Sequence, residues 1–282
     1  MSRSLRQSDR SHIKPQRKWG QHFLINPHVR DRILKACHLK PDETVLEIGP
    51  GLGALTEGLI PQVKKVYAIE PDKRFYDTLC RRFDSDKFVL IRDDFLKYDL
   101  MDLPSHLKCL GNLPYNISTP ILEKVMANRA RMGTCFFTVQ HEFGKRLAAR
   151  PFCKDYGALS CYVQYSCDVK LLFTIGRSAF RPAPKVTSCL VQLSFKKPSP
   201  RAKDEKLLFH IIRHAFQQRR KKIANALYPF VAKETLRAVL PKSPIQETQR
   251  PDQITLKDYV ILSDLISDTR EKETGEKGRE ER

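Results

Sequence analysis

The chain has 282 residues and a formal net charge of +19, and 41% of its residues are hydrophobic. This length accommodates one large domain, or one domain with a small appendage, and the hydrophobic fraction suffices for a sizeable core. The excess of basic residues indicates a polyanionic partner, either a nucleic acid or an acidic membrane surface, without bearing on the fold.

Membrane, secreted and metal-binding proteins are disfavoured by simple features of the sequence. No apolar run approaches the roughly 18 residues of a membrane span, and the first residues lack the apolar core of a signal peptide. We therefore expect a cytoplasmic protein with no membrane partner. The eight cysteines include no C-x-x-C pair, so we expect reduced core thiols and no metal site.

The two ends of the chain differ in composition from the middle. Residues 1–19 are basic and poor in apolar groups, which predicts a disordered arm. A transit peptide is the alternative, although the segment lacks an apolar helical face. Residues 267–282 mix acids and bases with almost no apolar groups, and we expect a disordered tail there.

Between residues 20 and 197, short apolar runs alternate with segments of helical periodicity. Strands are expected at residues 44–48, 64–69, 87–92, 107–111 and 134–139, and helices at 29–37, 54–60, 72–82 and 119–128. This alternation predicts an α/β domain with a parallel, doubly wound, Rossmann-like sheet. Two further apolar runs, 168–175 and 186–195, have no helix between them, so we expect an antiparallel hairpin at the sheet edge.

A linker at residues 196–201 separates this domain from a region of purely helical periodicity. Helices are expected at residues 204–218, 221–228, 232–239 and 255–266. We therefore assign residues 198–266 to a small all-α C-terminal domain.

A glycine-rich string follows the first predicted strand, with the sequence Glu47-Ile48-Gly49-Pro50-Gly51-Leu52-Gly53. Glycines at positions such as Gly49 and Gly51 let a ligand approach the backbone closely. Together with Ala54 the string also satisfies G-x-G-x-x-G/A, so a nicotinamide dinucleotide site remains an alternative. A plain strand-to-helix turn would also accommodate these glycines.

Acidic residues end the next two predicted strands. Glu70 follows the second strand, where a carboxylate can accept hydrogen bonds from both hydroxyls of a ribose. Asp94 follows the third strand and can accept from an adenine amino group. Its neighbour Asp93 is the alternative for that contact.

The fourth predicted strand ends in Asn112-Leu113-Pro114-Tyr115. Ligands bind at the carboxyl ends of the strands of an open α/β sheet, so we expect the side chains of this motif to converge on one ligand-binding spot. The exocyclic amine of adenine is a poor nucleophile because its lone pair is delocalised, and acceptors aimed at its N–H groups favour attack on a sulfonium methyl. Asn112 Oδ1 and the carbonyl of Leu113 or Pro114 are such acceptors, and the Tyr115 ring can stack on the base. The motif therefore indicates methyl transfer to adenine, and it disfavours a dehydrogenase.

Taken together, four ordered motifs resemble those of the ribosomal RNA adenine dimethyltransferases, specifically the bacterial small-subunit enzymes. The motifs are Lys18 to Leu24, Glu47 to Gly53, Asn112 to Asn116 and Phe180 to Val186. The resemblance covers most of the chain. It implies S-adenosylmethionine-dependent dimethylation of two adjacent adenines in small-subunit ribosomal RNA, or in the small-subunit precursor particle, during ribosome biogenesis.

The resemblance also implies roles for individual residues. His22 and Leu24 would contact the cofactor, and Gly49, Gly51, Glu70, Asp94 and Asn112 would complete its shell. Asn112, Pro114, Tyr115 and Phe180 would form the catalytic site, with Phe180 facing the target adenine opposite Tyr115. A plain core position is the alternative for Phe180.

The helical domain carries an unbroken basic run at Arg219, Arg220, Lys221 and Lys222. Such a run is usually a solvated surface. In a chain of this net charge with an adenine site, we expect it to contact RNA phosphates. We expect a monomer. The alternatives are a large-subunit ribosomal RNA dimethyltransferase and a ribosome-assembly factor that binds RNA without catalysis.

Overall fold

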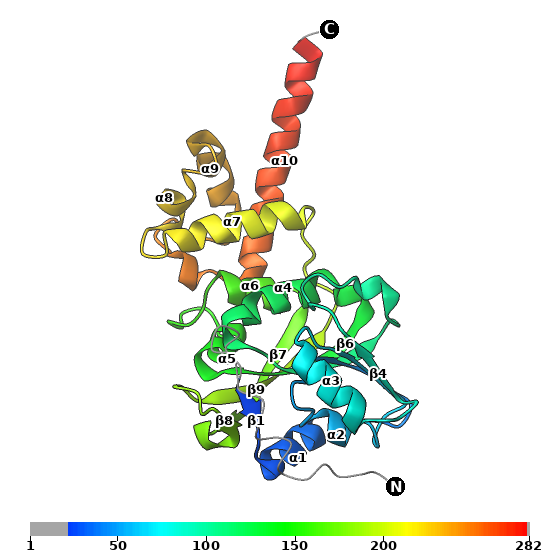
Figure 1. Ribbon diagram of the computed structural model, residues 1–282. Helices are drawn as coiled ribbons and strands as arrows, with labels where there is room; N and C mark the ends of the chain where they lie inside the picture. The colour runs from blue at the N-terminus through cyan, green and yellow to red at the C-terminus, as the bar shows by residue number, and fades with distance from the viewer. Residues whose placement is uncertain (1–21, 281–282) are drawn as a thin grey trace. The chain divides into compact units, whose positions relative to one another are not determined.

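The computed structural model describes the backbone of residues 22–280 (Figure 1). It describes the side chains of residues 22–271. The chain divides into two compact units. The first holds residues 22–144 and Asp168–Phe195, and the second holds Lys145–Cys167 and residues 196–280. The basic arm expected at residues 1–19 lies outside the described residues.

The first unit is built on a seven-stranded sheet with the order β4-β3-β2-β5-β6-β9-β7. The strands are β2 (Thr44–Ile48), β3 (Lys65–Ile69), β4 (Phe88–Ile91), β5 (Leu107–Asn112), β6 (Met132–Gln140), β7 (Cys167–Ile175) and β9 (Ser188–Phe195). Strands β2 to β6 are parallel to their neighbours, whereas β9 is antiparallel to β6. The predicted doubly wound, Rossmann-like sheet is therefore confirmed, and β7 lies next to β9 at the sheet edge as expected.

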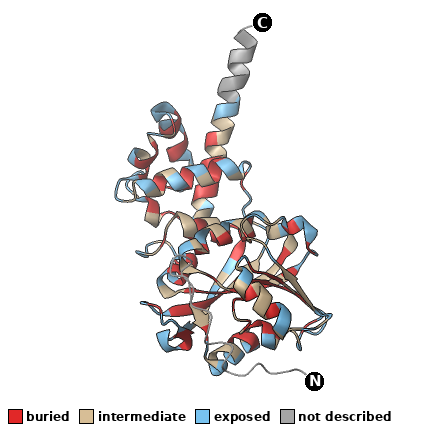
Figure 2. Cartoon of the chain, in the orientation of Figure 1, coloured by how far each residue is buried: buried red, intermediate tan, exposed pale blue. Residues whose placement is uncertain are grey.

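Helices connect the strands, as the alternating pattern predicts. They are α1 (Pro27–Ala36), α2 (Thr56–Leu59), α3 (Lys73–Arg82), α4 (Ser118–Ala127) and α5 (His141–Ala148). Local signals set their starts: the Asn26 side chain accepts from Val29 N at the start of α1, and Asp72 accepts from Arg74 N at the start of α3. The interior strands are largely buried (Figure 2), which explains their continuous apolar runs.

The strand order places a topological switch point between β2 and β5. The chain passes from β2 to β3 and β4 on one side, then returns to add β5 on the other side of β2. In open α/β sheets the crevice at such a point, outside the carboxyl ends of the strands, is where ligands bind. The glycine string leaves β2 there and the Asn112 motif leaves β5.

Two short strands form a separate sheet in this unit. Strand β1 (Phe23–Leu24) pairs antiparallel with β8 (Phe180–Arg181), with Leu24 opposite Phe180. This pairing brings the N-terminal motif next to the late motif, although Leu24 and Phe180 are 156 positions apart in the chain.

The second unit is all-α, as predicted, but its boundary differs from the prediction. Its helices are α6 (Ala158–Gln164), α7 (Glu205–Gln217), α8 (Ile223–Leu227), α9 (Lys233–Val239) and α10 (Leu256–Glu280). The sequence assigned residues 145–167 to the methyltransferase domain. Instead Tyr156, Cys161 and Tyr165 are buried in the helical core together with Leu208 and Ile211. Side chains that share one core belong to one compact unit.

Residues 267–282 were predicted to form a tail without structure, yet α10 continues through residue 280. Contacts within the second unit hold the described start of this segment. Lys203 Nζ lies 2.5 Å from Asp268 Oδ1, and the Arg270 guanidinium lies 5.6 Å from the centre of the Phe230 ring. These partners lie far away in sequence, so composition did not reveal them.

Within the described residues, no helix combines the length and the apolar character needed to cross a membrane. The same part of the chain contains no group of three or more His, Cys, Asp or Glu side chains placed to hold a metal ion.

Candidate active site

The turn after β2 depends on its glycines. Gly49, Gly51 and Gly53 have φ values of +64°, +55° and +75°, in the left-handed region that side chains rarely adopt. A Cβ built on Gly49 would meet nothing within 4 Å, so the backbone there borders open space. At Gly49 the turn therefore offers bare backbone to a ligand.

Glu70, at the end of β3, fastens this turn. Its Oε2 accepts a hydrogen bond from Gly51 N at 3.0 Å, and its Oε1 accepts from Asp72 N at 3.0 Å. The side chain is only 3% exposed. Burial raises the pKa of Glu70 to about 7, and the two backbone hydrogen bonds oppose that rise. Each carboxylate oxygen retains a lone pair for a further donor.

A second buried carboxyl group, Glu47, lies behind the glycine turn. Thr56 Oγ1 donates to Glu47 Oε2 at 2.6 Å, which links β2 to α2. Burial raises the pKa of Glu47 to about 7, the Thr56 hydrogen bond opposes this, and the charge of Glu70 adds to it. No separate role was predicted for Glu47, although an acid inside an apolar strand is a signal that could have singled it out.

These two carboxyl groups should make stability depend on pH. The unfolded chain releases their protons near the ordinary value of 4.5, whereas the folded chain holds them until about 7. Between these values the folded state binds more protons, so the free energy of unfolding falls as pH rises from about 5 to 7. We expect Glu47→Gln, which keeps an acceptor for Thr56, to lessen that fall. Urea unfolding at pH 5 and pH 8 tests this, and an equal fall in both proteins would contradict it.

Asn112 is held in one orientation at the end of β5. Its Nδ2 donates to the backbone carbonyl of His22 at 2.6 Å. A carbonyl oxygen can only accept, so the nitrogen of the amide must face His22. The acceptor Oδ1 is thereby left for another group. His22 also bonds through Nδ1 to the Pro182 carbonyl at 2.7 Å.

Tyr115 is half-buried in the turn after Asn112. Its hydroxyl lies 2.6 Å from Ser188 Oγ, and its ring centre lies 5.3 Å from that of His22, with the rings tilted by 30°. Burial raises the pKa of Tyr115, and the hydrogen bond with Ser188 opposes the rise. The phenol therefore stays neutral at physiological pH.

The two carbonyl groups considered as acceptors in this turn differ. The Pro114 carbonyl accepts from Ser118 Oγ at 2.9 Å and from Ile117 N at 3.1 Å, which begins the following helix. Both lone pairs of that oxygen are thus engaged. Leu113 is therefore the better source of a second acceptor beside Asn112 Oδ1.

One pocket in the first unit brings most of the expected site residues together. Its lining includes His22, Leu24, Gly49, Gly51, Glu70, Asp94, Asn112, Pro114 and Tyr115. Asp94 belongs to this lining and Asp93 does not, which favours Asp94 of the two adjacent acids.

Phe180 is the exception, and its expected position facing the target base is wrong for this structure. The side chain is 3% exposed and belongs to the apolar core with Ile33 and Leu190 instead of the pocket lining. Its strand β8 pairs with β1, and this pairing turns the ring into the core. Which way a residue of a two-residue strand faces depends on its partner strand, so the motif alone did not reveal it.

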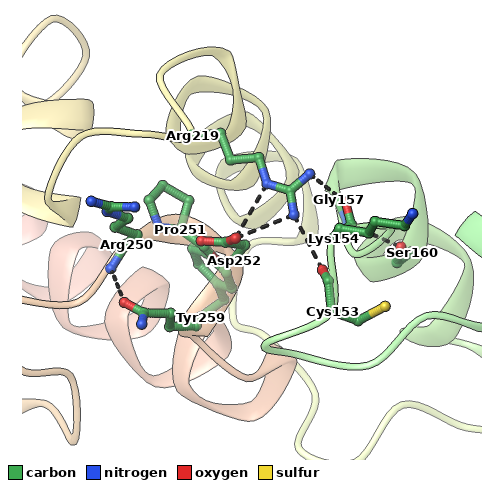
Figure 3. A network of polar contacts seen from close by, with 10 residues as sticks. Cys153, Lys154, Gly157, Ser160, Arg219, Arg250, Pro251, Asp252 and Tyr259 are labelled. Atoms are coloured by element: carbon green, nitrogen blue, oxygen red, sulfur yellow. Dashed lines mark hydrogen bonds and ion pairs between the residues drawn. The ribbon is translucent and has the colours of Figure 1, made fainter.

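The basic run in the second unit is not uniform (Figure 3). The half-buried Arg219 binds Asp252 Oδ2 at 3.2 Å, the Lys154 carbonyl at 2.6 Å and the Cys153 carbonyl at 3.1 Å. Its guanidinium therefore ties three segments of this unit together. The other members, Arg220, Lys221 and Lys222, are exposed.

The fold and the pocket together define a Rossmann-like methyltransferase. The features that define it are the parallel sheet, the glycine turn at its switch point, the acid after β3 and the Asn-Leu-Pro-Tyr turn after β5. Comparison with known proteins narrows this class. The family model for ribosomal RNA adenine dimethylase matches residues 13–268. The chain belongs to that family.

Several relatives match along nearly their whole length. The chain is 40% identical over 260 residues to the ribosomal RNA small subunit methyltransferase A of Pseudomonas fluorescens, covering 90% of this chain and 95% of the relative. It is 37% identical over 256 residues to the protein of the same name from Clostridium acetobutylicum, with coverages of 89% and 93%.

Two solved structures of methyl-transferring enzymes superpose on most of the chain. A dimethyladenosine transferase from Plasmodium falciparum superposes with a TM-score of 0.73 at 25% identity, covering 86% of this chain and 96% of that one. The 23S rRNA methyltransferase ErmE superposes with a TM-score of 0.66 at 22% identity, covering 87% and 99%, and shares the fold alone.

Proposed function

We propose that this protein transfers methyl groups from S-adenosylmethionine to the exocyclic amines of two adjacent adenines in small-subunit ribosomal RNA. The observation that carries the proposal is the orientation of Asn112, whose Nδ2 is committed to the His22 carbonyl and whose Oδ1 is left to accept. The names of the relatives support the choice of the small subunit.

The pocket fits a nucleoside cofactor in the first unit. The bare backbone at Gly49 borders open space, and the buried Glu70 carboxylate is available to ribose hydroxyls. Asp94 and Leu24 would complete the shell. When bound, S-adenosylmethionine supplies an electrophilic methyl group.

Asn112 and Leu113 supply the acceptors for the target amine. Hydrogen bonds from its two N–H groups to Asn112 Oδ1 and the Leu113 carbonyl favour the tetrahedral geometry that makes the nitrogen nucleophilic. After one transfer a single N–H remains, so one acceptor suffices for the second transfer. The alkylated amine can lose its proton to water, and no residue is needed as a base.

Tyr115 would hold the target base by stacking. With Phe180 in the core, the aromatic group beside Tyr115 in this structure is His22. This contact supports a role for His22 on the target side of the pocket as well as on the cofactor side.

The reaction is tested with purified protein, S-adenosylmethionine and small-subunit RNA from cells that lack the gene. Mass spectrometry should find dimethyladenosine at two adjacent positions. Methylation of large-subunit RNA instead would favour the large-subunit enzyme. Cofactor binding without transfer to any RNA, or to precursor particles, would favour an assembly factor.

The exposed members of the basic run in the second unit, Arg220, Lys221 and Lys222, are proposed to contact RNA phosphates. We expect the triple change of Arg220, Lys221 and Lys222 to alanine to flatten the plot of log affinity against log salt by about 2–3 units, since each phosphate contact adds roughly 0.7–0.9. Cofactor affinity should not change.

Arg219→Ala provides the matched control for this experiment. Because Arg219 is engaged with Asp252 and two carbonyls, its loss should lower the melting temperature and leave the salt slope near that of the wild type. A triple variant with an unaltered salt slope would make the run a solvated surface. An Arg219 variant that alone flattened the slope would restore Arg219 to the RNA contact.

A further inference from the structure

The hydroxyl group of Tyr115 is bonded to a residue outside the pocket lining. Stacking on a base uses the face of the ring, and the hydroxyl is bonded instead to Ser188 at 2.6 Å. Ser188 opens β9 and is fully buried. A contact across 73 positions of the chain thus joins the turn after β5 to the first residue of a strand two places away in the sheet.

The surrounding backbone makes Ser188 a fixed anchor. Ser188 is paired in register with Gln140 of β6, so its position is set by the antiparallel ladder. Leu113 N donates to the Thr138 carbonyl of the same strand β6 at 3.0 Å. Ser188 and the turn that carries Tyr115 are therefore both hydrogen-bonded or paired to β6. The Tyr115 ring, whose hydroxyl is bonded to Ser188, has little freedom to tilt.

We propose that Ser188 is a positioning residue for methyl transfer, which fixes the plane of the Tyr115 ring against the target adenine. The inference rests on the proposed function, because it concerns how that base is presented. Asn112 is anchored by the His22 carbonyl and Tyr115 by Ser188. Each group on the target side of the pocket is thus oriented by a partner from a distant segment.

This arrangement has a specific energetic consequence. Ser188 is buried and Tyr115 is half-buried, and their hydroxyls lie 2.6 Å apart, so deleting either one leaves the other without this partner. If the hydroxyl acts only through Ser188, then Tyr115→Phe and Ser188→Ala remove the same interaction. Their effects on the rate of transfer should not add.

The test is a double-mutant cycle read by single-turnover methyl transfer with saturating cofactor and small-subunit RNA. We expect Tyr115→Phe and Ser188→Ala each to slow transfer by about tenfold, the rate factor that corresponds to the free energy of one such hydrogen bond when it is lost in the transition state. The double variant should also be slowed by about tenfold and not by about a hundredfold. The affinities for cofactor and for RNA, measured by binding titration, should stay near those of the wild type, because the Tyr115 ring and the basic residues proposed to bind phosphates are unchanged. Ser188→Thr, which keeps a hydroxyl, should recover part of the rate.

Ser194→Ala is the matched control. Ser194 lies half-buried on the same strand, and its hydroxyl accepts a hydrogen bond from Gln192 Nε2 at 3.0 Å. Ser194 does not belong to the pocket lining. Its loss should leave the rate unchanged. A wild-type rate in Ser188→Ala, additive losses in the cycle, or an equal loss in Ser194→Ala would each overturn the inference while the wild-type protein remained an adenine methyltransferase. A wild-type protein that transfers no methyl to RNA would overturn the proposed function, and the inference with it.

Discussion

Replacing Asn112 with alanine is expected to lower the single-turnover rate of methyl transfer by about 10²–10³-fold, the loss found when one preorganised polar group at a reacting centre is removed. The physical reason is the orientation of the amide. Its Nδ2 donates to the His22 carbonyl, so its Oδ1 is already oriented as an acceptor before the substrate binds. The measurement is transfer of labelled methyl to small-subunit RNA at saturating substrates.

The control for this change is His22→Ala. That variant keeps the backbone carbonyl of residue 22, so the anchor of Asn112 survives, although the His22 contacts with Tyr115 and Pro182 are lost. We expect a smaller loss than in Asn112→Ala. If Asn112→Ala retained a rate within a few-fold of wild type, acceptor hydrogen bonds from this side chain would not drive the reaction.

Replacing Glu70 with alanine should weaken S-adenosylmethionine binding by roughly ten- to hundredfold, corresponding to about 1.5–3 kcal/mol for hydrogen bonds to a charged group. Two effects combine in this loss. The ribose loses its acceptor, and the glycine turn loses the carboxylate that accepts from Gly51 N and Asp72 N. Titration calorimetry measures the combined loss of affinity, and thermal unfolding without cofactor measures the second effect by itself.

Glu70→Gln separates these two effects. The amide has the same shape and one acceptor oxygen, so it can keep one of the two backbone hydrogen bonds while lacking the charge. We expect its melting temperature to lie between those of the wild type and the alanine variant, with a cofactor affinity still clearly reduced. Unchanged affinity in both variants would remove Glu70 from the cofactor site.

Much of the first unit was predictable because its signals are local. The alternation of apolar runs and helical periods gives the parallel sheet, and the positions directly after β2, β3 and β5 place Gly49, Glu70 and Asn112 at one edge. Parallel strands all end at the same side of a sheet, so chain order alone brings these residues together. The helical periodicity beyond residue 204 predicted the helices of the second unit for the same reason.

Other features depend on partners that no local pattern names. The face that Phe180 presents follows from its pairing with Leu24, and the engagement of Arg219 follows from Asp252, 33 positions away. The same holds for the packing of Tyr156 and Tyr165 with the helices of the second unit.

The sequence by itself therefore determined the order of the elements and the chemical groups at the switch point, since periodicity and turn chemistry act over a few residues. Only the tertiary structure decided how those groups are held. Asn112 is oriented by a carbonyl 90 positions earlier, and Tyr115 is bonded to a serine 73 positions later. Hydrogen bonds between such distant residues form only when the strands that carry them are in register, and register is a property of the assembled sheet.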